Sequence, residues 1–382
     1  MKKVIIVGAS YAGLSAAKKL AQSSDVEVLL IDKNSYHYIQ VESYGFVATK
    51  YKASDVTVNT SDYIKDLNAN VKFFKNEVLS FDSSAKTITT VDNEIHSYDE
   101  LIIATGSLTN FPPQVPNIEK YSRGIKTLQR ASEVEQTFDK VINDANWQEK
   151  SDEKKSYNMV IGGAGLSGVE IAAEMANLLK KYRSKTNTEA YEINIIIVDG
   201  MPTVLPGMDE RLVNACQKRL EELGIQIHLG SFIKDVDESK IYLMNEVEID
   251  YDYFVFTGGV KAITLNSQKT YEVNKLNQYI INDKLQLPGE DNIHVIGDAA
   301  QIMINDKYFP PTAQIAIKAG EHVANDIASN SNNRFDFKSS GVLVSLGGSY
   351  AIGLANDKYF ITGLFAHILK KVVTTMWKRK FV

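Results

Sequence analysis

Residues 2–13 read KKVIIVGASYAG, and this stretch decides the fold. A short apolar run, long enough for one buried strand, ends at Gly8 and is followed by a helical pattern over residues 11–22. Residues 26–32, VEVLLID, are a second apolar strand that ends in an acid. Strand, glycine turn, helix and strand make a βαβ unit, which predicts a parallel sheet covered by helices.

The same pattern returns in the middle of the chain. We expect a strand at 158–162, a helix at 166–181, a strand at 192–199 and a helix at 209–223. Residues 98–107 and 251–259 are buried strands that both end in a turn of small residues, and the polar residues 143–158 are expected to be an exposed connection. One βαβ-based module therefore occurs twice, and the predicted fold class is α/β with two Rossmann-like dinucleotide-binding domains.

Two glycine-rich loops, GASYAG at 8–13 and GAGLSG at 163–168, each follow a strand and open a helix. The first glycine permits a tight turn, the second lets the backbone approach a pyrophosphate, and the third lets the helix pack on the strand. The helix N-terminus attracts the phosphates. The expected phosphate-binding residues are Gly8, Ser10 (in place of the middle glycine) and Gly13, and in the second loop Gly163, Gly165 and Gly168.

Each module ends its second strand in an acid, Asp32 or Asp199, which can hold the ribose hydroxyls of an adenosine. Asp32 lies 24 residues after Gly8, whereas Asp199 lies 36 residues after Gly163, so residues 180–191 are predicted to be an insertion. Two dinucleotides in one chain imply electron transfer between them, with FAD in one module and NAD(P)H in the other. Asp199 would repel a 2′-phosphate, which favours NADH over NADPH.

Composition excludes several classes of protein. The 382 residues suggest two or three domains, and a net charge of −5 does not favour nucleic-acid binding. Cys216 is the single cysteine, so the chain has no Cys-x-x-Cys pair, cysteine zinc site or iron–sulfur cluster, and a reducing compartment is expected. No metal site or transmembrane helix is predicted. The histidines, none at metal-ligand spacing, are His37, His96, His228, His294, His322 and His367.

A late strand at 292–298, NIHVIGD, ends in Gly297 and Asp298. With this motif the chain resembles the two-dinucleotide-binding-domain flavoproteins, and within them the type II NADH dehydrogenases, which are single-subunit NADH:quinone oxidoreductases. The resemblance covers most of the chain. Further segments that carry it are GAGLSGVEIAAE at 163–174, FTGG at 256–259, PPTAQIAIK at 310–318 and the glycine-rich hairpin at 341–353.

The resemblance implies a domain order. A discontinuous FAD-binding domain would comprise residues 1–125 and 260–330, and an NADH-binding domain residues 126–259. The polar stretch at 329–334 then precedes a C-terminal region, residues 331–382, with a hairpin and an amphipathic helix.

The resemblance also implies roles for particular residues. Asp298 would contact the ribityl chain of FAD, and a helix starting near Thr312 would direct its first amides at the flavin. The expected FAD-binding residues are Gly8, Ser10, Gly13, Asp32, Lys33, Thr105, Gly106, Gly297, Asp298, Ala313 and Gln314. Those expected to bind NADH are Gly163, Gly165, Gly168, Glu170, Asp199 and Gly258.

Three residues are expected to be catalytic: Glu170, Gln314 and Lys318. Glu170 would lie near the interface of NADH and flavin; the alternative is a solvated helix carboxylate. Lys318 stands where the family has a second glutamine at the quinone site, and its ammonium could donate to a quinone oxygen. Other functions remain open: an apoptosis-inducing-factor-like or redox-sensor flavoprotein, or a sulfide:quinone-reductase-like enzyme, which the single cysteine disfavours.

The C-terminal segment combines an apolar stripe with basic residues. Apolar side chains recur at helical spacing at Leu364, Phe365, Ile368, Leu369, Val372, Val373, Met376 and Trp377. Five cations accompany them without an anion: Lys370, Lys371, Lys378, Arg379 and Lys380. The stripe is too short to span a bilayer and predicts a helix lying in the interface, on the cytoplasmic face, close to a membrane quinone of the respiratory chain. The alternatives are docking on the protein's own core or on a second copy in a homodimer.

Overall fold

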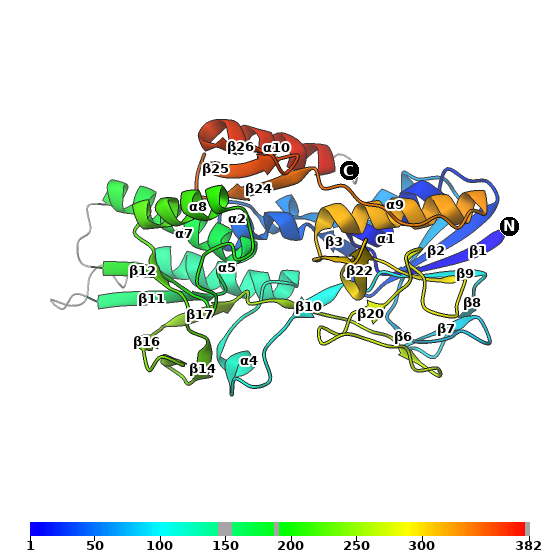
Figure 1. Ribbon diagram of the computed structural model, residues 1–382, viewed down its shortest axis with the longest axis horizontal. Coiled ribbons are helices and arrows are strands. Elements are labelled where there is room, and N and C mark those ends of the chain that lie inside the picture. The colour runs from blue at the N-terminus through cyan, green and yellow to red at the C-terminus, as the bar shows by residue number, and fades with distance from the viewer. Residues whose placement is uncertain (144–154, 187–190, 379–382) are drawn as a thin grey trace.

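The computed structural model describes residues 1–143, 155–186 and 191–378 of the chain. It is an elongated α/β molecule with a parallel sheet at each end (Figure 1). The sheet of the N-terminal half has the order β21-β9-β1-β2-β5. Its strands are β1 (Lys2–Val7), β2 (Val26–Asp32), β5 (Val71–Lys75), β9 (Glu100–Ile103) and β21 (Ile293–Val295). The late strand β21 therefore returns to the first module, pairing with β9.

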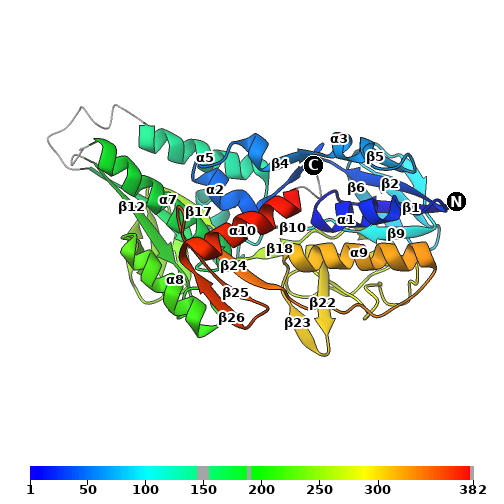
Figure 2. The same ribbon diagram turned by 90° about the horizontal axis from the view of Figure 1, so that it is seen from above.

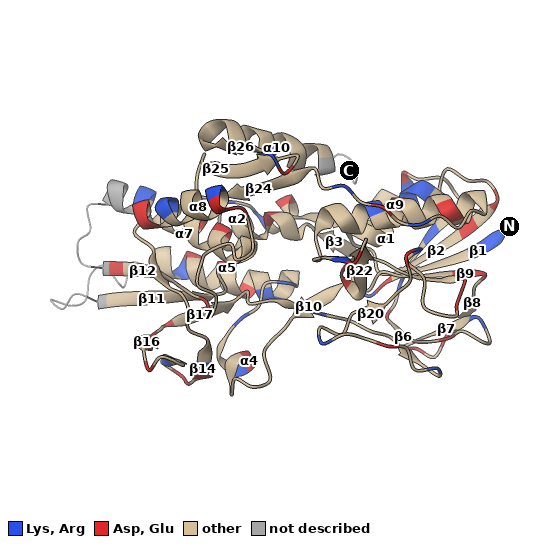
Figure 3. Cartoon of the chain, viewed as in Figure 1, with Lys and Arg blue, Asp and Glu red and all other residues tan. Residues whose placement is uncertain are grey.

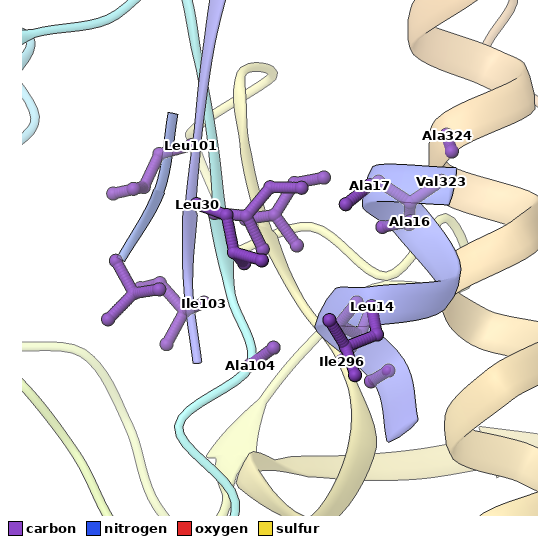
Figure 4. Close-up of a cluster of buried hydrophobic side chains, with 14 of the residues drawn as sticks. Leu14, Ala16, Ala17, Leu30, Leu101, Ile103, Ala104, Ile296, Val323 and Ala324 are labelled. Atoms are coloured by element: carbon purple, nitrogen blue, oxygen red, sulfur yellow. The ribbon is translucent and has the colours of Figure 1, made fainter. Parts of the chain in front are cut away.

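Helix α1 (Tyr11–Leu20) lies between this sheet and the long helix α9 (Ala313–Ser329). Figure 4 shows the cluster that results: Leu14 of α1 and Leu30 and Ile103 of the sheet are buried together. Small side chains on both helices, such as Ala16 and Ala324, let the helices approach closely. The glycine loop is thus fixed between a β-sheet and two packed helices.

The second sheet has the order β13-β12-β11-β17, again all parallel. Its strands are β11 (Lys155–Gly162), β12 (Tyr191–Val198), β13 (Gln226–His228) and β17 (Tyr253–Phe256). The helices around it are α5 (Leu128–Asn143), α7 (Leu166–Thr186) and α8 (Glu210–Glu222). This arrangement confirms the predicted duplication of the βαβ-based module.

Short strands and turns complete the two halves. The antiparallel and mixed strands are β3 (Tyr36–Tyr38), β4 (Thr57–Asn59), β6 (Val78–Asp82), β7 (Thr87–Thr90), β8 (Ile95–Ser97), β14 (Ile233–Val236), β15 (Lys240–Leu243), β16 (Glu248–Asp250), β19 (Asn266–Ser267), β20 (Tyr279–Ile280), β22 (Ala300–Ile304) and β23 (Lys307–Phe309). The short helices are η1 (Gln40–Glu42), α2 (Ser43–Val47), η2 (Ala53–Asp55), α3 (Thr60–Lys65), α4 (Ile118–Tyr121) and η3 (Gly297–Ala299). The chain crosses between the halves at β10 (Ser107–Thr109) and β18 (Val260–Ala262), which pair antiparallel.

The C-terminal region sits on top of the second half (Figures 1 and 2). It consists of β24 (Gly341–Ser345), β25 (Ala351–Ala355), β26 (Tyr359–Thr362) and α10 (Gly363–Lys378). The expected hairpin is therefore extended by a third strand, β26, which pairs with β25 and leads directly into the helix. Among the residues that the structure describes, none of the helices has the length and apolar character needed to cross a bilayer.

Strand β11 and helix α7 extend several residues beyond their predicted bounds. Strand β11 begins at Lys155, inside the expected exposed connection, because it pairs with β12 from Tyr191 onward. Residues 144–154 of that connection lie outside the described residues. Helix α7 continues to Thr186, beyond its predicted end at residue 181, so the first part of the expected insertion is helical. The remainder, 187–190, is also outside the described residues.

Candidate functional site

The two glycine loops have nearly identical backbone geometry. A Cβ at Gly13 would lie 1.8 Å from the carbonyl oxygen of Gly8, and a Cβ at Gly168 would lie 1.8 Å from that of Gly163. A side chain at either position would collide with the backbone of the turn. The third glycine of each loop is therefore required by the fold itself, before any ligand is considered.

The middle positions of the loops, unlike the third glycines, are not crowded by the backbone of the turn. A Cβ at Gly165 would meet no atom within 4 Å, so this glycine leaves open space in front of the loop. Ser10 is the N-cap residue of α1, yet its side chain makes no capping hydrogen bond to the helix. Because no side chain caps this helix, the first N–H groups of α1 can donate to a phosphate, as a phosphate-binding helix N-terminus requires. Both loops fit the pyrophosphate of a dinucleotide.

The strand-end acids are held in the same way in both modules. Asp32 accepts hydrogen bonds from the backbone N–H groups of Ala9 (2.7 Å) and Asn34 (2.7 Å). Asp199 accepts from Ala164 (2.6 Å) and Met201 (2.8 Å). Burial raises the pKa of Asp32, and the two backbone N–H groups oppose that shift. Each carboxylate is therefore fixed beside its own glycine loop.

Lys33, the next expected FAD-binding residue, forms an ion pair with Glu77 at 2.9 Å on the rim of the same sheet. Thr105 and Gly106 lie where the chain crosses between the halves. The Thr105 hydroxyl donates to the carbonyl of Ile263 (2.5 Å), and the N–H of Ile263 donates to the carbonyl of Gly106 (3.0 Å). These two residues therefore join β10 to the segment that follows β18.

Asp298 is the centre of a polar cluster that the sequence did not reveal. Its carboxylate accepts from the Ser107 hydroxyl (2.5 Å) and from the Lys126 ammonium (3.1 Å). Lys126 also donates to the side-chain oxygen of Gln40 (3.0 Å), and the Gln40 amide donates to the carbonyl of Lys126 (2.8 Å). Asp298 thus lies where three distant segments converge beside α1 and α9, which fits a carboxylate that orients a ligand.

The start of α9 carries the expected residues Ala313 and Gln314. Thr312 is the N-cap, and its hydroxyl accepts from the N–H of Ile315 (3.3 Å). The Gln314 side chain is engaged by the C-terminal region, because it donates to the Gly341 carbonyl (3.2 Å) and accepts from the N–H of Ser340 (3.1 Å). Lys318, one turn on, is mostly exposed and pairs with Glu321 at 2.6 Å.

Glu170 is buried, with 9% of its surface exposed, so it is not the solvated helix carboxylate of the alternative interpretation. Its Oε1 accepts from the N–H of Ser345 (2.8 Å) and forms an ion pair with Lys370 of α10. Burial raises the pKa of Glu170, and the Lys370 ammonium opposes this shift. Gly258, another expected NADH residue, follows β17 beside the second loop, where a Cβ at Gly163 would lie 3.0 Å from its nitrogen.

A cavity of about 160 Å³ lies between α10 and the segment around α2. Glu42, Tyr44 and Tyr51 line one side, and residues of α10 line the other. The α10 residues are His367, Lys370, Lys371, Thr374, Thr375 and Lys378. The Lys370 ammonium stands 4.7 Å from the centre of the Tyr44 ring, and it is the same ammonium that pairs with Glu170. The Lys370 side chain therefore links the cavity to the buried carboxylate of Glu170.

The cavity was not predicted, although its residues are visible in the sequence. Lys370 was expected among the cations directed at a membrane, and that expectation is wrong for this residue, because its side chain turns inward to Glu170. Burial lowers the pKa of His367, and the nearby Lys371 and Lys50 lower it further.

The chain is similar to known proteins over most of its length. Residues 2–320 match the family model described as pyridine nucleotide-disulphide oxidoreductase. A protein named type II NADH:quinone oxidoreductase from Staphylococcus epidermidis is 30% identical to this chain, with 98% of this chain and 94% of that protein covered. Its namesake from Staphylococcus haemolyticus is 29% identical over the same shares.

Two solved structures share the fold. NDH2 from Plasmodium falciparum, in complex with NADH, has a TM-score of 0.85 at 20% identity and covers 98% of this chain and 94% of its own. The sulfide:quinone oxidoreductase from Aquifex aeolicus has a TM-score of 0.84 at 19% identity, covering 100% of this chain and 91% of its own. Identities this low establish the common fold, not a common activity.

Proposed function

The chain belongs to the pyridine nucleotide-disulphide oxidoreductases and, among them, to the type II NADH:quinone oxidoreductases, and on that premise we propose that it oxidises NADH and reduces a quinone with FAD as its cofactor. The overall change is NADH + H⁺ + quinone → NAD⁺ + hydroquinone. The observation that carries the proposal is the pair of glycine loops, each with its strand-end acid, in a chain that matches these enzymes over almost its whole length.

We place FAD in the first module. The amides at the start of α1 bind the pyrophosphate, Asp32 takes the adenosine ribose, and Asp298 orients the chain that leads to the flavin. FAD, once bound, accepts a hydride and passes electrons on, which no side chain of this protein can do. The amides of Ala313 and Gln314 at the start of α9 offer a partial positive charge at that end of the site.

We place NADH in the second module, with the loop 163–168 on the pyrophosphate and Asp199 on the ribose. NADH thereby lies on the half of the molecule that adjoins Glu170. This carboxylate is the acid that we assign to the junction of the two sites. Its ion pair with Lys370 links it to the cavity under α10.

The quinone headgroup, on this account, enters the cavity between α10 and Tyr44. Hydroquinone formation consumes two protons at the quinone oxygens, and Lys370, whose ammonium pairs with Glu170, is a proton donor in the cavity lining. Gln314 and Lys318 remain proposed catalytic residues on the strength of the family motif. In this structure they contact Gly341 and Glu321, and neither lines the cavity.

We further propose that α10 holds the enzyme on the cytoplasmic face of the membrane as a peripheral protein. One face of α10 packs on β24 and β25, whereas a contiguous apolar face is open to solvent. The exposed apolar residues are Leu364, Phe365, Ile368, Val372, Val373 and Met376. The ribbon of α10 is mostly tan in Figure 3, which marks few charges in that view. Such a face suits the acyl–headgroup boundary where long-tailed quinones dissolve.

Liposome binding tests this placement. Changing Leu364, Phe365, Ile368, Val372 and Met376 to Gln should release the protein from anionic liposomes and lower activity with long-tailed quinones more than with short-chain analogues. A matched control changes exposed apolar residues of the opposite half, Leu79, Val91 and Ile95. If the α10 variant still sediments with liposomes, or if it instead splits a homodimer, the membrane role of this face is wrong.

A sulfide:quinone reductase, the alternative with the same fold, needs a redox pair of cysteines. Cys216 is the single cysteine, it is fully buried, and burial raises its pKa to about 12. A redox-sensor flavoprotein differs in its kinetics, since its reduced flavin would persist in the presence of quinone.

Stopped-flow absorbance decides between these functions. Purified protein should show a flavin spectrum that NADH bleaches rapidly and that a short-chain quinone restores at a comparable rate. A colourless protein, or a reduced flavin that quinone leaves unchanged, would refute the proposed activity.

A further inference from the structure

Three large apolar side chains stand exposed at or beside the carboxyl ends of β12 and β13, and Met244 reaches this place through its backbone contact with Phe232. Met201, Phe232 and Met244 expose 43%, 58% and 62% of their surfaces. They follow β12, β13 and β15, and Met201 is two residues beyond the strand-end acid Asp199. Exposed aromatic and thioether groups are costly to leave in water unless something covers them.

The Phe232 ring is fixed against the turn that carries Asp199. A Cβ added to Gly200 would lie 2.2 Å from Cδ1 of Phe232, so the ring occupies the space that a side chain at residue 200 would need. The backbone holds this arrangement from both sides: the N–H of Gly230 donates to the Met201 carbonyl (2.9 Å), and the N–H of Met244 donates to the Phe232 carbonyl (2.9 Å). The ring is therefore positioned rather than loosely attached.

The corresponding place in the first module carries charges instead. There the residue after the strand-end acid is Lys33, and it pairs at 2.9 Å with Glu77, which follows the neighbouring strand β5. In the second module the residue after the acid is Gly200, and Phe232 follows the neighbouring strand β13. The duplicated unit thus has an ion pair at one rim and an apolar platform at the other.

We propose that Phe232, flanked by Met201 and Met244, is the surface on which the adenine ring of NADH packs. Adenine is bonded directly to the ribose, so a ribose held by Asp199 brings the base to the turn on which Phe232 lies. The flat face of a purine stacks on an aromatic ring and contacts thioethers favourably. The proposal rests on the NADH site assigned above and adds the group that recognises the adenine end of the donor.

Donors with and without adenine test the proposal. For Phe232→Ala, KM for NADH and the inhibition constant of ADP-ribose should both rise about tenfold, with kcat for NADH nearly unchanged. Flavin reduction by reduced nicotinamide mononucleotide, which lacks adenine, should not show this rise. Phe232→Trp, which keeps a stacking face, should retain tight NADH binding. Ile95→Ala, an exposed apolar residue on β8 of the other half, is the matched control and should change neither donor.

Folding is checked by the flavin spectrum and thermal melting, which an exposed ring should barely influence. The inference is overturned if Phe232→Ala leaves KM for NADH unchanged, or if it weakens both donors equally. It is also overturned if the variant alters the sedimentation mass but not NADH binding, because the patch would then be an interface between two copies. A wild-type flavin that NADH fails to reduce would instead refute the proposed function itself.

Discussion

The two βαβ modules share a loop and an acid but differ in what the rest of the chain adds to them. The first module receives β21, Asp298 and α9 from more than 250 residues further on, and these close around α1. The second module receives the C-terminal region, which contacts it through the buried Glu170 of α7. A loop surrounded on several sides suits a cofactor that stays bound, and a more open loop suits a substrate that must leave.

Replacing Asp298, which joins the first module from late in the chain, should have the largest effect of the changes described below. Asp298→Ala should give largely colourless protein, because it removes the carboxylate assigned to FAD and leaves the Lys126 ammonium without its acidic partner. Asp199→Ala, which removes the acid assigned to NADH in the second module, should stay yellow. The flavin absorbance per protein after gel filtration measures both, and full occupancy in Asp298→Ala would overturn the assignment of the modules.

Breaking the contact between the second module and the C-terminal region should have the second-largest effect. Lys370→Met leaves Glu170 buried without its cation and should lower the free energy of unfolding by about 3–5 kcal/mol. Burial already raises the pKa of Glu170, and the variant removes the charge that opposes this shift.

The pH dependence of that loss has a definite sign. A carboxyl whose folded pKa exceeds its unfolded value binds more protons when folded, so stability is lost as pH rises above the ordinary carboxyl range. Urea titrations should therefore show a larger deficit for Lys370→Met at pH 8 than at pH 5. Adding Glu170→Gln should recover part of the deficit. Equal deficits at both pH values would show that Glu170 is not the group left unpaired.

The preference for NADH over NADPH should be a smaller effect than the two above. The ratio of kcat/KM for NADH to that for NADPH should be at least about tenfold, or roughly 1.4 kcal/mol, because the Asp199 carboxylate would face the 2′-phosphate. Asp199→Ala should narrow the ratio. Equal wild-type values for the two donors would mean that Asp199 does not contact this ribose.

The smallest effect should come from the middle position of the second loop. Gly165→Ser reproduces the residue that the first loop carries at Ser10, and a Cβ there would meet no protein atom within 4 Å. Thermal stability should change by less than about 0.5 kcal/mol, whereas KM for NADH should rise a few-fold. A large fall in melting temperature would show that Gly165 serves the fold rather than the ligand.

The sequence alone was sufficient to predict the modules because their signals are local. A strand, a turn and a helix within 30 residues specify Gly13 and Asp32 together, and the second copy repeats the pattern. The family resemblance supplied the return of Asp298, since nothing local to residues 292–298 states which sheet they join. Strand β11 begins earlier than predicted because its pairing with β12, and not its own composition, determines where it starts.

The parts of the site that the sequence does not reveal are contacts between distant segments. Lys370 lies 200 residues from Glu170, and Lys126 lies 172 residues from Asp298. A lysine on an amphipathic helix looks the same in sequence whether it faces lipid headgroups or a buried carboxylate. Only the packing of α10 over the second module distinguishes the two, so the sequence alone predicts Lys370 among the membrane-facing cations.

We assign FAD to the first module and NADH to the second, and a crystal structure of the purified yellow protein soaked anaerobically with NADH tests this assignment most directly. The adenosine of FAD should lie beside Asp32 with its pyrophosphate on residues 8–13, and the adenosine of NADH should lie beside Asp199 with its pyrophosphate on residues 163–168. FAD on the second loop, or NADH bound away from both loops, would contradict the account.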